Sequence, residues 1–162
     1  MKYRTVAALS TALGKRVAES GYSETYRNEA GFETDVWNRV VDFMSDIGPD
    51  VASTCLTSHE WNKPRSAAEW KAFCLTKRGP DVNVLGSNNR LDIVVRHPDG
   101  GSIGIEVKCL GDGRHPIKLT QGIGQAILAL EHRERTLLLI HCGTVPTAER
   151  ERLRKIARCR RP

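Results

Sequence analysis

Three charged residues stand in two stretches that otherwise look like β-strands. Asp92 interrupts the apolar run 91–96, and Glu106 and Lys108 interrupt the run 103–109. Strand interiors disfavour Asp and Lys, so a specific reason is needed for their presence. Two neighbouring carboxylates repel each other unless a cation lies between them, and Mg²⁺ is typically held by one or two carboxylates, waters and a substrate phosphate. These residues therefore indicate metal-dependent chemistry on a phosphate, with a plain surface ion pair between Glu106 and Lys108 as the alternative.

The spacing of these residues predicts that they meet. Side chains alternate across a strand, so Glu106 and Lys108 share one face of theirs. The connection "HPDGG" has the Pro, Asp and Gly residues of a tight turn, which predicts a hairpin. A hairpin centred on Asp99 places Asp92 opposite Glu106, and a centre half a step later makes the two carboxylates diagonal neighbours. Lys108 beside a metal could then orient or help to deprotonate a water and offset charge on the attacked phosphate.

The elements that must position the hairpin alternate between helix and strand. The order is helix, three strands, helix, strand, helix, which predicts an α/β or α+β domain with a central sheet. Residues 51–64 are left unassigned. The expected helices are 1–20, ended by Gly21, a second from Glu24 or Asn28 to Ile47, then 66–77, 120–133 with Thr120 as N-cap, and one from Pro146; the expected strands are 82–85, 91–96, 103–109 and 136–142.

The second helix carries a misplaced carboxylate. Its apolar residues recur at helical spacing, and Glu33 falls near the centre of that stripe rather than on the polar side. Glu29 lies one turn earlier on the same side. A carboxylate turned toward a core is costly unless it is paired or metal-bound. Glu33 is thus a candidate site residue and Glu29 the second choice; the alternative is a Glu that reaches out to solvent or pairs with a buried cation.

Composition bounds the class of protein. The chain has 162 residues, enough for a single domain with a real core, and no apolar run long enough to span a bilayer. Five scattered cysteines favour neither a disulfide framework nor a zinc site, so a reducing cytoplasm is expected. The net charge is +6, and residues 149–162 hold seven Arg or Lys against two Glu. That basic end is either a solvated tail or a contact for a polyanion such as nucleic acid.

"LDIVV…IGIEVK" resembles the core motif of the PD-(D/E)xK nuclease superfamily, in which an Asp on one strand and an (Asp/Glu)-x-Lys on the next bind Mg²⁺ and cleave a phosphodiester. The resemblance implies a restriction-endonuclease-like fold, a central mixed sheet flanked by helices in the order α-β-β-β-α-β. It would make 24–142 the core of a single domain 1–162, with 1–22 as a helical extension and 146–162 as a basic helix or tail. The dipeptide "PD" itself occurs at Pro80-Asp81, but Asp92 heads the strand that pairs with Glu106 and is preferred.

The resemblance also implies roles for individual residues. Glu33 would match the Glu on the first core helix of many members. In the helix after the hairpin, an apolar face is formed by Ile123, Ala126, Ile127 and Leu130, and Gln121 and Gln125 lie roughly opposite. Gln125 would match the Gln of a Q-x-x-x-Y signature, although Ala129 stands where the Tyr would be; two solvated Gln are the alternative. The residues assigned are Asp92, Glu106, Lys108, Glu33 and Gln125 for catalysis, Asp92, Glu106, Val107 and Glu33 for metal, and Gln121 for nucleic acid. Lys118 and Arg114 are assigned to nucleic acid from their expected position in the loop before this helix, where they could meet phosphates; an ordinary polar loop is the alternative.

The sequence thus predicts a Mg²⁺-dependent nuclease, with Mn²⁺ able to substitute, that hydrolyses DNA as an endonuclease of restriction or junction-resolving type. The alternative is a nuclease-fold module without catalysis that binds nucleic acid or a protein partner. DNA as the substrate is implied by the resemblance alone. No membrane association is expected. The small chain leaves no separate recognition domain, so a homodimer or another partner could supply specificity.

Overall fold

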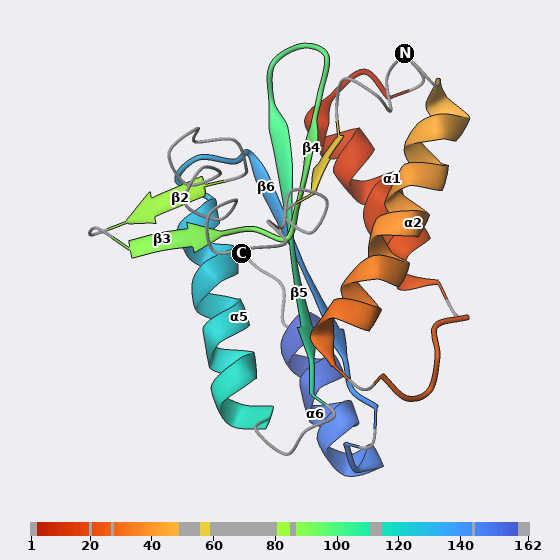
Figure 1. Cartoon of the computed structure of the whole chain (residues 1–162), viewed down its shortest axis with the longest axis vertical. Helices are drawn as coiled ribbons and strands as arrows, with labels where there is room; N and C mark the ends of the chain where they lie inside the picture. The colour runs from red at the N-terminus through yellow and green to blue at the C-terminus, as the bar shows by residue number, and fades with distance from the viewer. Residues whose placement is uncertain are drawn as a thin grey trace, which may run out of the picture.

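A mixed sheet organises the chain. The computed structural model describes residues 3–19, 21–26, 28–48, 56–58, 81–84, 87–110, 115–143 and 145–158, and for 56–58, 81–84, 87–90, 115–116 and 156–158 the backbone alone. The elements are α1 (Val6–Ala18), α2 (Glu29–Ile47), β1 (Leu56–Ser58), β2 (Asp81–Val84), β3 (Ser87–Arg90), β4 (Ile93–Arg96), β5 (Ser102–Cys109), α5 (His115–Ala129), β6 (Arg135–His141) and α6 (Thr147–Arg158) (Figure 1). The protein is therefore of mixed α/β class, and no helix among the described residues has the length and apolarity to cross a membrane.

The main sheet has the strand order β1-β4-β5-β6. β1 with β4 and β4 with β5 are antiparallel, and β5 with β6 is parallel, which requires the crossover that α5 provides. The predicted hairpin is confirmed: Ile93 pairs with Ile105 and Arg96 with Ser102, so the turn is centred on Asp99. In this turn Gly100 has φ 102°, which only Gly adopts without strain.

One expectation about the strands was wrong, and one strand was missed. The stretch expected at 82–85 forms β2, which does not join the main sheet but pairs with β3 in a separate two-stranded sheet. Its place beside β4 is taken by β1, from a stretch that the sequence left unassigned. β1 has three residues, too few for any alternating pattern to be detected. The helix expected at 66–77 lies outside the described residues.

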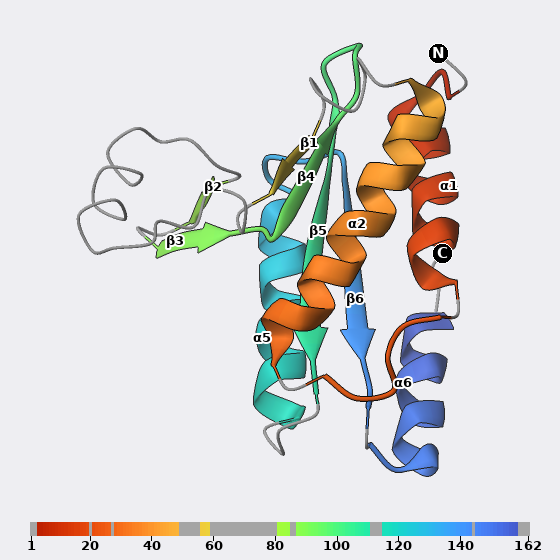
Figure 2. The same ribbon diagram turned by 45° about the vertical axis from the view of Figure 1, so that its right-hand side comes forward.

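The two faces of the sheet are covered differently. α1 and α2 pack on one face, and α5 lies on the other (Figures 1 and 2). The larger core joins buried residues of α1 and α2, such as Leu13 and Val40, to alternate residues of the hairpin, such as Ile93 and Ile105. The smaller core places Leu91 and Val94 against Ala129 of α5. Glu106 and Lys108, by alternation, belong to the α5 side of β5.

The helix ends follow local chemistry. The side chains of Thr5 and Asn28 accept hydrogen bonds from the N–H groups of Ala8 and Gly31, which caps the starts of α1 and α2. α2 ends at Ile47, as predicted, with Gly48 as its C-cap. α5, by contrast, begins at His115, so Thr120 lies inside the helix and the prediction that it is the N-cap was wrong.

Candidate metal and phosphate site on strand β5

The second half of β5 has an open edge. β4 pairs with β5 only from Ser102 to Ile105, whereas β6 pairs with it from Ile103 to Cys109 on the other side. Residues 106–109 therefore have no partner strand on the β4 side among the described strands. Within this stretch Glu106 and Lys108 are buried, at 1% and 5% exposure. Buried charges of this kind need specific partners.

Asp92 lies directly before β4 and faces this edge. Its Oδ2 accepts a hydrogen bond of 2.7 Å from the N–H of Val107, the residue between Glu106 and Lys108. Continuing the hairpin register by one residue places Asp92 opposite Glu106, which is one of the two registers that the turn sequence allowed. The alternative acid, Asp81, lies in the separate β2–β3 sheet, paired with Arg90. The preferred acid, Asp92, thus contacts the Glu-Val-Lys segment directly.

Glu106 and Lys108 form a short buried pair. Lys108 Nζ lies 2.6 Å from Glu106 Oε1 and donates a second hydrogen bond of 3.0 Å to the carbonyl of Val107. Glu106 Oε2 is buried and has no hydrogen-bond partner among the described residues. Burial raises the pKa of Glu106 to about 7, assisted by the charge of Asp92 and opposed by Lys108. The pKa of Lys108 is also raised, because burial, which lowers it, is outweighed by the Glu106, Asp92 and Glu29 carboxylates.

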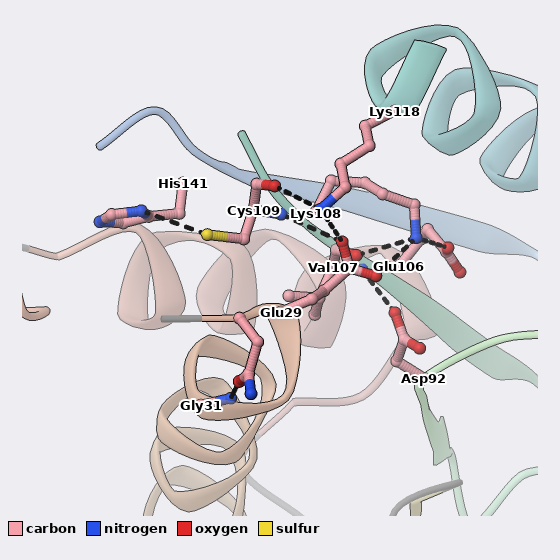
Figure 3. A network of polar contacts seen from close by, with 10 residues as sticks. Glu29, Gly31, Asp92, Glu106, Val107, Lys108, Cys109, Lys118 and His141 are labelled. Atoms are coloured by element: carbon pink, nitrogen blue, oxygen red, sulfur yellow. Dashed lines mark hydrogen bonds and ion pairs between the residues drawn. The ribbon is translucent and has the colours of Figure 1, made fainter. Parts of the chain in front are cut away.

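Glu29 reaches the same place from the first turn of α2. Its Oε1 lies 3.3 Å from Lys108 Nζ, and its Oε2 accepts a hydrogen bond of 3.2 Å from the N–H of Cys109 (Figure 3). Lys118, from the first turns of α5, donates to the carbonyl of Cys109 at 3.1 Å and lies 3.9 Å from Glu29 Oε2. Four charged side chains thus occupy the N–H and C=O groups of Val107 and Cys109 along this edge.

Glu33, the preferred residue on α2, is buried at 4% exposure. It lies one turn after Glu29 and shares the sheet-facing stripe with Val36, Val40 and Met44. This burial agrees with the misplaced carboxylate seen in the sequence. The helix carboxylate observed on Lys108, however, is that of Glu29, the second choice. A role for Glu33 as a metal ligand stays a prediction.

α5 turns an unexpected side toward the sheet. A Cβ on Gly122 would lie 2.8 Å from Lys108 Cγ, so this Gly lies directly over the lysine stem. Gln125, one turn on, is half-buried, and its buried Oε1 has no hydrogen-bond partner among the described residues. Its assignment as a catalytic residue stays a prediction. Gln121 is exposed. Lys118 reaches β5, and Arg114 lies outside the described residues.

A contact that the sequence did not reveal joins the ends of β5 and β6. Cys109 Sγ lies 3.8 Å from His141 Nδ1, and His141 Nε2 lies 3.0 Å from the carbonyl of Ser23. A carbonyl accepts only, so Nε2 carries the proton and Nδ1 is left as an acceptor for the thiol. The parallel pairing of Cys109 with His141 creates this contact, and no sequence spacing signals it.

The residues fit a divalent cation held in part by substrate. The described residues contain no group of three or more His, Cys, Asp and Glu side chains arranged to hold a metal. Two carboxylates, those of Asp92 and Glu106, and the carbonyl of Val107 do converge, and within the described part of the chain Glu106 Oε2 has no donor. Oxygen donors of this number suit Mg²⁺, which keeps several waters and is often completed by a phosphate.

Comparison with known proteins gave no relative. No family model, no curated protein and no solved structure matches the chain.

Proposed function

We propose that this protein is a metal-dependent nuclease with a restriction-endonuclease-like core that hydrolyses phosphodiester bonds of DNA. The observation that carries the proposal is the convergence of Asp92, Glu106 and Lys108 at the open edge of β5, where the buried Glu106 Oε2 has no donor among the residues that the structure describes. A structural ion pair would satisfy both oxygens of such a carboxylate. One left without a donor suits a site that receives a cation with its substrate.

The chain order of the elements supports the proposed core. α2 is followed by the antiparallel strands β1, β4 and β5, then by α5, and then by β6 parallel to β5. This is the α-β-β-β-α-β order expected from the resemblance, with β2 and β3 inserted between the first two core strands. The acids lie where β4 separates from β5, at the edge of β5 that no described strand covers.

The site residues have distinct roles in this proposal. Asp92, Glu106 and the carbonyl of Val107 would hold Mg²⁺, which when bound polarises the scissile phosphate and lowers the pKa of a water. Lys108 would use its ammonium to orient that water and to offset negative charge on the phosphate. Glu29 holds the Lys108 ammonium from the other side, which fixes its position. The basic side chains of α6, among them Arg152 and Arg154, are exposed and suit a polyanionic substrate.

The direct test is cleavage. Labelled single-stranded, duplex and branched DNA, and RNA, are incubated with the protein and Mg²⁺ or Mn²⁺, with EDTA as the blank. We expect the protein to cut DNA at internal phosphodiester bonds. The cleavage rate of Lys108→Ala should be at least about 100-fold lower, because the lysine acts on the water and the phosphate. Lys15→Ala, on the outer side of α1, is the matched control and should cut like the wild type.

The outcomes separate the candidate functions. The nuclease proposal fails if no substrate is cut, or if cutting persists in EDTA and in Lys108→Ala. DNA binding without cutting would instead favour the non-catalytic module. Calorimetric titration tests metal binding separately. If an Asp92→Ala, Glu106→Ala double variant binds Mg²⁺ as the wild type does, Asp92 and Glu106 are not the metal ligands.

A further inference from the structure

The outer side of α5 is apolar. The large hydrophobic side chains that are exposed in the described part of the chain all lie on α5 or directly after it: Ile117 (68% exposed), Ile123 (38%), Ile127 (61%) and Leu130 (52%). α5 covers one face of the sheet, away from α1 and α2, and its outer side points away from the sheet (Figures 1 and 2). A scattered exposed Leu or Ile is ordinary, but a contiguous stripe marks an interaction surface.

The shape and charge of this face restrict its occupant. Ile123, Ile127 and Leu130 are spaced i, i+4, i+7 and so form one ridge. A Cβ on Gly124 would meet nothing within 4 Å, so the helix backbone is open beside this ridge. No charged residue occurs from Leu119 to Leu130. An uncharged face does not attract nucleic acid, whose basic contacts are available on α6 instead.

We propose that this face binds the same face of a second copy of the chain, with the two α5 helices antiparallel. The apolar positions are self-complementary, which a two-fold interface requires. A two-fold axis between positions 123 and 124 places Ile117 against the partner's Leu130 and Ile123 over the partner's Gly124. The same axis sets Thr120 opposite the partner's Ile127. A large side chain thus meets a smaller residue at the centre of the contact, where Ile123 meets Gly124 and Ile127 meets Thr120, and Ile117 packs on Leu130 at each end.

The charges at the helix ends agree with this arrangement. Glu131 is exposed and directly follows Leu130. With the same axis it lies beside the first turn of the partner's α5, where the helix dipole carries partial positive charge. The antiparallel pair also places opposite helix ends together. A parallel pair would instead bring the two Glu131 carboxylates close to each other.

The size of the face sets the expected strength. α5 has 15 residues and is therefore about 22 Å long. One helix face buries clearly less than the roughly 800 Å² per partner of a standard stable interface. The dimer should therefore be weak and reversible, with Kd in the range of about 10–100 μM. The dimer contact lies on the outer side of α5 and so does not cover the candidate metal site on the inner side. The dimer proposal does not depend on the nuclease proposal.

Sedimentation velocity tests the surface. From about 1 to 300 μM, the wild-type sedimentation coefficient should rise from that of a monomer to that of a dimer. Ile127→Glu, which buries a charge in the contact, should weaken the dimer at least 10-fold. Asn38→Glu adds the same charge at an exposed position of α2 and should leave the dimer unchanged.

The register has its own test. Thr120→Lys and Ile127→Glu should each weaken self-association when the variant is alone. When the two variants are mixed they should form a heterodimer, because the new lysine of one then faces the new glutamate of the other. The proposed surface is overturned if the wild type stays monomeric over the whole range, or if Asn38→Glu and Ile127→Glu weaken dimers equally. A mixture that associates no better than either variant overturns the antiparallel register.

Discussion

The charge of Lys108 is shared between three oxygens. Its ammonium contacts Glu106 Oε1, the Val107 carbonyl and Glu29 Oε1 within 3.3 Å. Burying a lone ammonium would cost several kcal/mol, and these oxygens offset that cost. Two of them, on Glu106 and Val107, belong to the proposed metal ligands. The lysine therefore offsets part of the negative charge of the surrounding carboxylates.

Glu106 makes the stability of the metal-free protein depend on pH. The pKa of Glu106 is raised from 4.5 to about 7, chiefly by burial. At a pH between these two values the Glu106 carboxyl is protonated in the folded state and ionised in the unfolded state. The free energy of unfolding should therefore fall as pH rises between these two values, with a total effect of order 1–3 kcal/mol. In Glu106→Gln this contribution is absent.

The difference between wild type and Glu106→Gln isolates that effect. Urea denaturation in EDTA, from about pH 4.5 to pH 8, should show the variant gaining stability relative to the wild type as pH rises. Other titrating groups largely cancel in the difference. Parallel pH profiles for the two proteins would refute the raised pKa.

At the scale of elements, α5 fits the site because small and polar residues face the sheet. Its inner stripe consists of Lys118, Gly122, Gln125 and Ala129. Gly122 leaves room for the Lys108 stem, since a Cβ there would also lie 3.1 Å from Leu138 Cδ1. The helix thereby approaches β5 closely enough to lay Lys118 on the Cys109 carbonyl. Larger side chains on this side of α5 would increase the distance between α5 and β5.

Two glycines of α5 provide a matched pair of variants. Gly122→Ala should destabilise the protein by about 1–2 kcal/mol, because the clash with a buried lysine stem outweighs the gain of about 1 kcal/mol in helix propensity. Gly124→Ala, in open space, should instead stabilise it by about 0.5–1 kcal/mol. Thermal denaturation at a low, monomeric concentration measures both. Equal effects of the two substitutions would contradict the close approach at Gly122.

At the scale of the whole molecule, the N-terminal segment belongs to the core. Leu9, Leu13 and Val17 of α1 are buried in one cluster with α2 and the hairpin. Beyond the helix, His97 Nε2 at the hairpin turn lies 3.0 Å from the carbonyl of Tyr3. The first helix thus supports α2, which in turn carries Glu29 to the site.

Leu13→Ala should cost about 2–5 kcal/mol of unfolding free energy, since it leaves a cavity between α1 and the rest of the core. The neighbouring Thr11 is exposed, and Thr11→Ala should change stability by less than about 0.5 kcal/mol. Chemical denaturation followed by circular dichroism compares the two. A Leu13→Ala loss no larger than that of Thr11→Ala would show that α1 is dispensable for the fold.

The sequence by itself determined the local geometry of the site. Alternation in the strands and the turn "HPDGG" predicted the hairpin and the convergence of Asp92, Glu106 and Lys108, because these depend on residues close in the chain. They left two positions open for the centre of the turn, and the structure places it at Asp99. The stripe of α2 likewise predicted that Glu33 is buried.

Tertiary structure alone decided which distant groups complete the site. Glu29 meets Lys108 across 79 positions of sequence, and Cys109 meets His141 only because β5 and β6 are parallel neighbours. Helical periodicity separated the apolar side of α5 from the side with Gln125 but could not say which would face the sheet. In the structure the Oε1 of Gln125 is buried and Ile127 is exposed. The reason is physical: over a strand that carries buried charges, small and polar residues fit, and the hydrophobic ones are left for another surface.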